Sequence, residues 1–527
     1  MSIRFLPGHT VGIDLGTTFS TAAQVNEEGE PIPIPNDDDD VETASLILLA
    51  DSGHVIVGPN RNRAALEKPE NVVERIKRHM GAVEYKRTFD GHEITPEFIS
   101  ALILKKLKQD GEKKIGLIGN AVITVPYYFN DARRKATQDA GQIAGLNVID
   151  IINEPTAATL TYAWHRGELG VVHADHFKPR RILIYDLGGG TFDSTLVEYT
   201  PTNFHVLATD GDVILGGVDW NDRILDFVAE EFKAKHGLDF RESAQVAQEM
   251  RNICDIAKVE LTTRQEAVIP CRYEGKSNTV RLERAKFEAL TVDLLQRTID
   301  TTEFVLEQGG MSSGDLDAIV LIGGSTLMPQ VARKLKEVTG IEPYTHPDLD
   351  PHTSVAKGAA IHAAILEARH RQDDTTLGER VKKMLESIRQ DDVNSHGLGV
   401  VALDPKSKKT VNHIMIPRNT TLPFQQTQVF QTNKDAQERV SVQVLEGDAP
   451  DPSACLLLGK CRIVDLPPNL PKGSPVEVTY SFDKAGRISV VASVAGQQAN
   501  IEIERRGTLS DEQVADLTKL ASEYVVQ

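Results

Sequence analysis

The same short phrase occurs twice in this chain, and the repetition constrains the fold more than any other feature. Residues 11–20 read VGIDLGTTFS, and residues 182–197 read ILIYDLGGGTFDSTLV. In each copy an apolar run ends in an aspartate, Asp14 or Asp186, which is followed by glycine and threonine. Glycine lets backbone N–H groups approach an anion, and an aspartate at a strand end can hold a metal ion through water. The two copies therefore predict two related lobes that hold one nucleotide between two phosphate-binding hairpins.

Hydroxyl side chains and a third glycine turn add to these two hairpins. Thr17, Thr18 and Thr191 follow the strand ends and can donate hydrogen bonds to phosphate oxygens. Residues 321–329, LIGGSTLMP, form another strand that runs into glycines and would suit the nucleoside end of the ligand. A purely structural duplication is the alternative, because a glycine turn after a strand is often only a turn. Two copies in corresponding settings favour an ATP-binding, two-lobed fold.

The first two thirds of the chain alternate short apolar strands with segments of helical periodicity. Residues 121–129, AVITVPYYF, indicate a buried strand. Asn130 is placed to cap the helix that follows, and Gly145 is placed to end it. Such alternation predicts α/β layers with a largely parallel sheet.

The character of the chain changes near residue 373. A polar connector is expected over 373–394, and short alternating strands over 395–505 predict an antiparallel β-sandwich. Ser510 and Gln513 form a capping box that begins a C-terminal helix within 506–527. We therefore expect a two-lobed α/β nucleotide-binding domain over 1–372, followed by the sandwich and a short helix.

Charge and cysteine usage narrow the function classes. The net charge is −18 and the sequence has no basic stripe, which argues against a nucleic-acid or anionic-membrane partner. The four cysteines lack metal-site spacing, so we interpret them as reduced thiols. The N-terminal residues lack the apolar core of a signal peptide, and no apolar run reaches transmembrane length. A cytoplasmic protein is expected.

Taken together, the motifs resemble those of a known protein family over nearly the whole chain. The sequence resembles the seventy-kilodalton heat-shock chaperones of the DnaK type, a branch of the actin-like ATPases. The matching segments, in order, are VGIDLGTTFS, AVITVPYYFNDARRKATQDAGQIAGL, IINEPTAATLTY, YDLGGGTFD, LGGVDWND, VLIGGSTLMP and PRNTTLPFQQTQVFQT. The phrase would then repeat because the fold is a pseudo-duplicated pair of actin-like lobes.

The resemblance implies roles for individual residues in ATP hydrolysis. Asp14 and Asp186 would order the water ligands of Mg²⁺, and Asp193 would help to place the attacking water or a potassium ion. The implied catalytic residues are Lys77, Glu154, Thr191 and Asp193. Pro126 and Arg134 match positions that relay nucleotide state to the outer surface. The implied contacts to ATP or ADP are Gly16, Thr17, Thr18, Phe19, Gly188, Gly189, Gly190, Thr191, Gly216, Gly217, Asp255, Lys258, Thr262, Gly323, Gly324 and Ser325.

In the β region the resemblance implies a pocket that holds an unfolded or extended peptide. Such a pocket takes a strand-like segment by backbone hydrogen bonds and buries one aliphatic side chain. Apolar residues of a sandwich are core by default, so this assignment depends on the family match. The implied peptide-binding residues are Val400, Leu403, Phe430, Asn433, Val440, Val442 and Val476.

Several positions depart from the family pattern. Val259 and Leu327 stand where two arginines usually flank adenine, and Asp150 stands where an arginine usually meets a J-domain co-chaperone. Leu403 and Asn433 replace an arch that tends to be apolar on both sides. No short apolar linker run occurs in 373–394, where MLESIRQDDV is the nearest match. Of the helical lid only the stretch 510–527 is expected, and it could brace the sandwich.

These motifs and departures leave two functions from different classes. The first is an ATP-driven, peptide-binding chaperone that assists folding, with a J-domain protein and a nucleotide-exchange factor as implied partners. The second is a nucleotide-dependent regulatory or scaffold protein that keeps the fold with a weakened cycle. Stimulation of ATP hydrolysis by unfolded peptide discriminates between them.

Overall fold

The structure is a computed structural model of the chain. It describes residues 3–50, 53–58, 69–82, 84–85, 87–170, 177–371, 377–404, 406–464, 466–482, 488–501 and 509–527. The domain boundaries expected at residues 372 and 505 lie outside the described residues, so these two limits stay predictions.

The first lobe is built on a sheet in the order β11-β10-β1-β2-β3, with β4 beside β2. Helices α2 (Pro96–Ile115) and α3 (Asp131–Ile143) pack on it and share one apolar core with its strands. Asn130 caps α3 as expected, by accepting a 3.0 Å hydrogen bond from the N–H of Arg133. The strands are β1 (His9–Asp14), β2 (Phe19–Val25), β3 (Pro31–Ile34), β4 (Thr43–Ala44), β10 (Ile118–Val125) and β11 (Asn147–Asn153).

The second lobe is built on a sheet in the order β17-β12-β13-β14-β18. Its strands are β12 (Arg180–Leu187), β13 (Phe192–Tyr199), β14 (Asn203–Asp212), β17 (Ala318–Ile322) and β18 (Arg389–Asp391). Helices α4 (Glu154–His165) and α10 (Ser354–His370) share a core with strands of both sheets, so they form a layer between the lobes.

The expectation of largely parallel sheets is wrong, because both sheets are mixed. β1 pairs parallel with β10 but antiparallel with β2, and β12 pairs parallel with β17 but antiparallel with β13. The physical reason is the two glycine turns themselves. Each joins its strands through only a few residues, and so short a connection makes a hairpin, whereas a parallel pair needs a long crossover.

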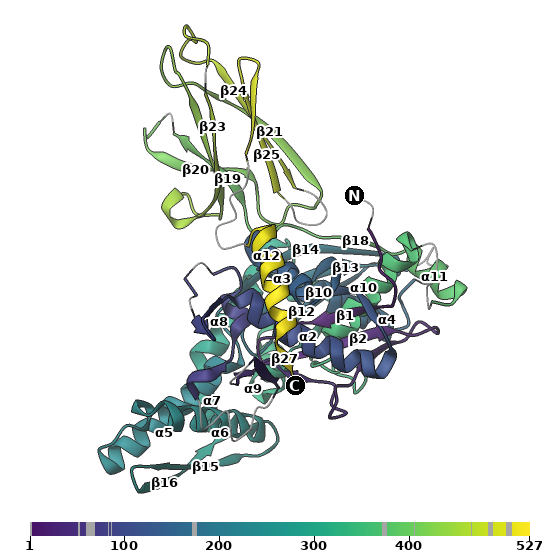
Figure 1. The fold of residues 1–527 in the computed structure, drawn as a ribbon, viewed down its shortest axis with the longest axis vertical. Helices are drawn as coiled ribbons and strands as arrows, with labels where there is room; N and C mark the ends of the chain where they lie inside the picture. The colour runs from purple at the N-terminus through teal and green to yellow at the C-terminus, as the bar shows by residue number, and fades with distance from the viewer. Residues whose placement is uncertain are drawn as a thin grey trace.

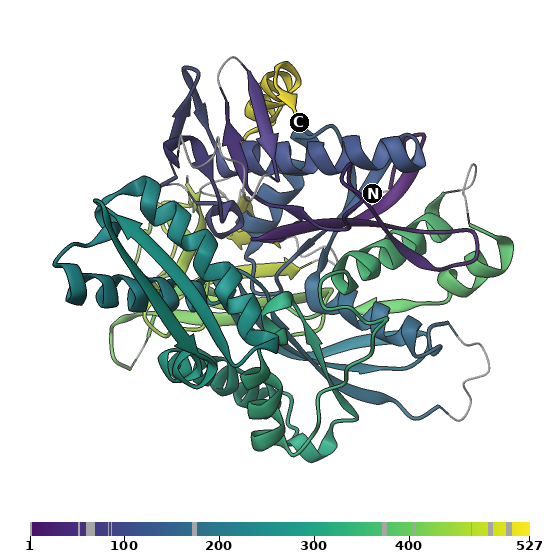
Figure 2. The ribbon, with the colours of Figure 1, turned by 90° about the horizontal axis from the view of Figure 1, so that it is seen from below.

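A helical extension completes the second lobe. Helices α5 (Gly217–His236) and α6 (Ala244–Thr263) pack beside the hairpin of β15 and β16, and one apolar core unites them with β12 and β13. Figure 2 shows these teal elements across from the purple strands of the first lobe. The remaining elements are β15 (Glu266–Tyr273), β16 (Lys276–Glu283), α7 (Arg284–Leu290), α8 (Val292–Gln308) and α9 (Pro329–Thr339).

The predicted β-sandwich is present as two four-stranded antiparallel sheets, in the orders β20-β19-β22-β23 and β21-β24-β25-β26. It stands at one end of the long axis in Figure 1. The strands are β19 (Leu398–Leu403), β20 (Thr410–Ile416), β21 (Phe424–Gln431), β22 (Val440–Glu446), β23 (Leu456–Ile463), β24 (Pro475–Phe482), β25 (Ile488–Val494) and β26 (Gln497–Ile501).

The segment expected to be a polar connector carries structure of its own. It contains α11 (Glu379–Glu386) and β18, and β18 pairs parallel with β14 at the edge of the second sheet. Periodicity did not reveal β18 because its residues, Arg389, Gln390 and Asp391, are polar. Backbone hydrogen bonds to a sheet edge do not require apolar side chains.

The sandwich contacts both lobes through polar and aromatic side chains. Arg418 donates a 3.1 Å hydrogen bond to the carbonyl of Thr209 and forms an ion pair with Asp210 at 3.2 Å. His396 stacks edge-on against Tyr128, with ring centroids 4.2 Å apart. These contacts fix the sandwich against the two lobes.

The C-terminal helix α12 (Asp511–Glu523) packs on the first lobe, so the expectation that it braces the sandwich is wrong. Its apolar side chains join the core of that lobe. Lys105 of α2 donates hydrogen bonds to the carbonyls of Ala521 and Tyr524 at 2.7 and 3.0 Å. β27 (Val525–Val526) then pairs parallel with β6 (His54–Val57). Figure 1 shows α12, in yellow, across this lobe.

We predict that Tyr524→Ala loosens this attachment. Tyr524 is 5% exposed, and its ring meets that of Phe98 edge-on at 5.7 Å. Removing a buried aromatic ring costs about 3 kcal/mol or more. Amide hydrogen exchange in β6 should accelerate, whereas the exposed neighbour Glu523→Ala should leave it unchanged. Unchanged exchange in Tyr524→Ala would show that the attachment does not depend on this ring.

Candidate nucleotide site

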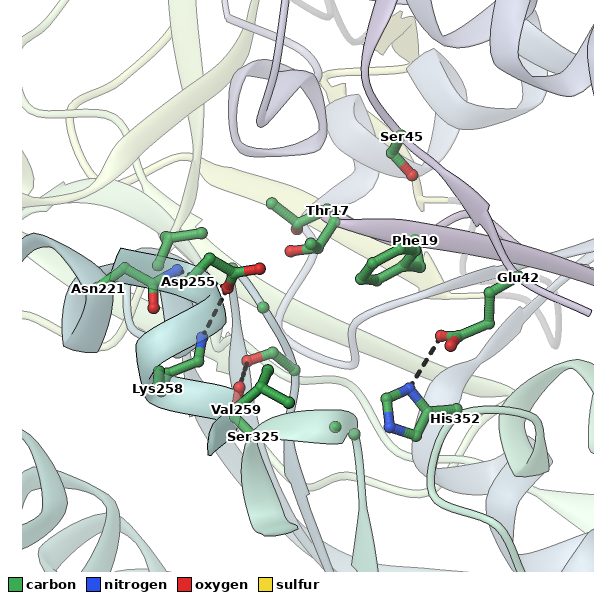
Figure 3. A pocket seen from close by; sticks show the side chains of 18 of the residues that line it. Thr17, Phe19, Glu42, Ser45, Asn221, Asp255, Lys258, Val259, Ser325 and His352 are labelled. Carbon is green, nitrogen blue, oxygen red and sulfur yellow. Dashed lines mark hydrogen bonds and ion pairs between the residues drawn. The ribbon is translucent and has the colours of Figure 1, made fainter. Parts of the chain in front are cut away.

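A cavity of about 700 Å³ lies between the two lobes, where the glycine turns meet (Figure 3). Most of the residues expected to contact nucleotide line it. They are Asp14, Gly16, Thr17, Thr18, Phe19, Lys77, Glu154, Asp186, Gly188, Gly189, Gly190, Thr191, Asp255, Lys258, Thr262, Gly323, Gly324 and Ser325. Asp193, Gly216 and Gly217 do not line the cavity, and they lie behind its wall.

The two glycine turns face each other without room for side chains. A Cβ atom on Gly189 would overlap the hydroxyl of Thr18, and one on Gly190 would overlap Thr17. The segment at Gly217 packs behind them, where its N–H donates a 2.9 Å hydrogen bond to the carbonyl of Gly188. Glycine at these positions is therefore required by packing as well as by access to an anion.

A buried lysine lies among carboxylates at the floor of the cavity. Lys77 is 4% exposed and donates a 2.5 Å hydrogen bond to Glu154. It belongs to a 3₁₀ turn over Ile76–His79 that begins after Arg75 in a left-handed conformation. Burial opposes the lysine's charge, but Glu154 and Asp14 outweigh burial, so the pKa of Lys77 is raised.

The carboxyl groups near this lysine outnumber it, and burial opposes their ionisation. Burial is the largest cause that raises the pKa of Glu154 to about 7 and that of Asp193 to about 7. Burial, Glu154 and Asp193 raise the pKa of Asp186 well above its ordinary value. One oxygen each of Asp186 and Asp193 has no hydrogen-bond partner among the described residues. Buried carboxyl oxygens without a hydrogen-bond partner fit a hard divalent cation such as Mg²⁺.

Asp193 is held from the first lobe although it belongs to β13 of the second. Its Oδ2 accepts a 3.0 Å hydrogen bond from the backbone N–H of Tyr127. The hydroxyl of the same tyrosine donates to the carbonyl of Val393 at 2.9 Å and accepts from its N–H at 2.8 Å. One residue therefore connects Asp193 to the segment that enters the sandwich. Tyr127 lies within the family-matching segment 121–146, but nothing in that segment indicated this role.

The end of the cavity that is expected to hold the nucleoside is polar on one wall. Lys258 forms an ion pair with Asp255 at 3.3 Å and donates a 3.1 Å hydrogen bond to the carbonyl of Gly217. Ser325 donates to the carbonyl of Gly188 at 2.9 Å. Val259 lines this end as expected. Leu327 does not line the cavity; it is 51% exposed, and the turn that carries it directs Ser325 inward instead.

Further polar residues at the site were not anticipated. His352 lies 2.8 Å from Glu42, and this hydrogen bond raises the pKa of His352 (Figure 3). Outside the cavity lining, Arg78 of the first lobe forms an ion pair with Asp219 of the second at 2.6 Å. Isolated charged residues carry no periodicity, and only the folded chain brings them together.

The residues expected to bind peptide divide into two groups. Four valines form part of the sandwich core, and Phe430 packs against that core. Leu403 is 52% exposed and Asn433 is also exposed, so both lie at the surface. The buried group is Val400, Val440, Val442 and Val476.

The chain has two lobes, each built on a mixed sheet, and a glycine hairpin of each lobe faces the cavity between them. A β-sandwich is joined to these lobes. This is the architecture of a two-lobed ATPase with an added β domain. The chain belongs to the Hsp70 family, since the model described as "Hsp70 protein" matches residues 10–87 and 82–527. It is similar to the chaperone protein DnaK of Thermotoga neapolitana, with 38% identity over 528 residues. The DnaK of Thermosipho melanesiensis is 38% identical over 529 residues. Each alignment covers 98% of this chain and 84% of the relative.

None of the helices within the described residues combines the length and apolar character needed to cross a membrane.

We predict that the nucleotide-free, Mg²⁺-free protein loses stability as pH rises through about 7. Asp193 has a folded pKa of about 7 against an ordinary 3.8, so its stabilising contribution is full below about pH 4 and is lost above about pH 7. Asp193→Asn mimics the protonated form. The midpoint of thermal unfolding of this variant should therefore exceed that of the unmodified protein increasingly between about pH 5 and pH 8.

Asp300→Asn, at an exposed aspartate, is the matched control. Its unfolding midpoint should differ from that of the unmodified protein by a constant amount across this pH range. A constant difference for Asp193→Asn as well would mean that Asp193 is already ionised at the lower pH.

Proposed function

We propose that this protein is an ATP-dependent molecular chaperone that hydrolyses ATP and binds extended segments of unfolded proteins. Membership of the Hsp70 family over nearly the whole chain carries this proposal. The interlocked glycine turns and the buried lysine support the cavity between the two lobes as the nucleotide site. We further propose the domain division 1–372, 373–394, 395–505 and 506–527.

The cluster of carboxylates suits the chemistry of phosphoryl transfer to water. A bound Mg²⁺ would neutralise phosphate charge, with Asp14 and Asp186 oriented toward its water ligands. Lys77 supplies a fixed positive charge where negative charge develops on the transferring group. Glu154, which lines the cavity and has a pKa of about 7, can accept a proton from the attacking water near neutral pH, while Asp193 acts from behind the cavity wall.

The sandwich is proposed to bind the peptide. The core valines and Phe430 offer an apolar lining for one aliphatic side chain, and strand edges offer backbone hydrogen bonds. Exposed Leu403 and Asn433 lie at the surface as candidates for the arch over the peptide.

Tyr127 is the proposed route by which the two activities communicate. Its N–H holds Asp193, while its hydroxyl holds both backbone groups of Val393. Thr156 donates a 3.0 Å hydrogen bond to Asp392 beside it. Movement of β18 or of residue 393 would therefore displace Tyr127, whose backbone N–H positions Asp193.

Co-chaperone binding is proposed to differ from the family pattern at Asp150. Its carboxylate lies 2.9 Å from Nε2 of His362 on α10. An acidic group here repels an acidic J-domain motif, so a J-domain partner would need a neutral or basic group at this contact. A nucleotide-exchange factor is a further proposed partner.

The test of this function is ATP hydrolysis with and without excess unfolded peptide. The unmodified protein should be stimulated by peptide. Tyr127→Phe keeps the N–H on Asp193 but loses the hydroxyl on Val393, so we predict normal basal turnover with reduced stimulation. Absence of stimulation in the unmodified protein would instead favour a nucleotide-dependent regulatory or scaffold protein.

We predict that Lys77→Ala slows hydrolysis by about 100- to 1,000-fold and leaves ATP binding largely intact. A charge that acts mainly on the developing transition state contributes to turnover more than to affinity. Single-turnover assays and calorimetry separate the two quantities. Lys336→Ala, at an exposed lysine, is the control. Lost binding with unchanged turnover of the bound fraction would contradict the assigned role.

We predict that Val259→Arg tightens ADP binding. Val259 lines the nucleoside end, and a guanidinium over an aromatic ring contributes about 0.5–2 kcal/mol, or roughly 2- to 30-fold in affinity. Leu327→Arg, outside the cavity lining, should have a smaller effect. Equal effects of the two variants in calorimetric titrations would show that Leu327 also reaches the base.

A further inference from the structure

Two histidines and an aspartate gather at a second place that does not line the nucleotide cavity. His165 is the last residue of α4, and His346 and Asp348 belong to the segment between α9 and α10. One potential ligand atom from each side chain lies within 4.8 Å of the others. We propose that His165, His346 and Asp348 bind a divalent transition-metal cation, with Zn²⁺ as the best-matching ion.

The chemistry of these three groups fits such a cation. Imidazole nitrogen and carboxylate oxygen are common Zn²⁺ ligands, and three protein ligands leave a fourth position for water. Mg²⁺ and Ca²⁺ prefer oxygen ligands alone, so two imidazoles discriminate against them. The two imidazole rings already lie close, with centroids 4.3 Å apart.

The contact between His346 and Asp348 has the spacing of two ligands on one metal ion. The N–H of Asp348 donates a 3.2 Å hydrogen bond to Nδ1 of His346, which makes that nitrogen an acceptor. Oδ2 of Asp348 lies 3.5 Å from the same nitrogen. Two bonds of about 2.0–2.1 Å at a tetrahedral angle place their ligand atoms roughly 3.4 Å apart. A cation between Nδ1 and Oδ2 would take the nitrogen lone pair that now accepts the Asp348 N–H, so metal binding exchanges that 3.2 Å hydrogen bond for two metal–ligand bonds.

His165 has the surroundings of a metal-ligating histidine. Its Nε2 lies 3.2 Å from the hydroxyl of Tyr344, so the other ring nitrogen is the one left for the metal. Metal-bound histidines usually bond an outer partner through their second nitrogen, which fixes the orientation of the ring.

The position of the cluster gives a bound ion a structural effect. α4 lies in the layer between the two sheets, and Tyr344 bridges to Val320 on β17 of the second sheet. An ion held by His165 and His346 would link the end of that layer to the chain leaving the second sheet. Binding to the folded state alone raises stability by mass action, so thermal unfolding should shift upward.

The experiment uses the full, untagged chain, stripped of metal and free of nucleotide. Zn²⁺ is titrated by calorimetry, and Co²⁺ is added as a spectroscopic probe of ligand geometry. One Zn²⁺ should bind per chain at this site, and both His346→Ala and Asp348→Asn should weaken binding by about 10-fold or more. These side chains are 42% and 76% exposed, so the substitutions should leave the fold intact.

His92→Ala, at an exposed histidine elsewhere, is the matched control and should bind like the unmodified protein. A Zn²⁺-dependent rise in the unfolding midpoint should be present in the control and absent in His346→Ala. Equal Zn²⁺ binding in the unmodified protein and His346→Ala would overturn the proposal. The cluster would then be only a surface contact among these three side chains.

Discussion

The steric contact between the two glycine turns is the constraint on which the rest of this structure depends. Gly189 and Gly190 lie against Thr18 and Thr17 with no room for a Cβ atom. Because each turn ends a strand of a different sheet, this contact brings the acidic strand ends of both lobes to one place. Burying several carboxylates together raises their pKa values, and Lys77 offsets only part of that cost. A cation and a phosphate group are the natural complement of such a site.

The same arrangement links the nucleotide site to the sandwich over a short path. Tyr127 contacts Asp193 with its backbone and Val393 with its side chain, so no long chain of intermediates is needed. The polar segment before Val393 contributes β18 to the second sheet, which fixes where the sandwich begins. Burial, followed by Asp131, raises the pKa of Glu446 on β22 to about 8. The carboxyl group of Glu446 is therefore largely neutral at neutral pH while the sandwich lies against the lobes as seen here.

The C-terminal segment attaches the end of the chain to the first lobe. The chain leaves the sandwich and returns to the first lobe, where α12 and β27 join the core that contains Phe98. The sandwich is thus held from both of its ends, through β18 on one side and α12 on the other.

The sequence by itself determined the features that are local or repeated. The duplicated phrase predicted two lobes, Asn130 predicted the start of α3, and alternation after residue 395 predicted a sandwich, because each depends on neighbours along the chain. The mixed sheets, β18 and the place of α12 were decided by tertiary structure, since strand pairing joins residues far apart in sequence. Glu42 with His352, and Tyr127 with Val393, are separated by 310 and 266 residues. No local pattern encodes such pairs, because their interaction energy appears only when the folded chain has brought both partners together.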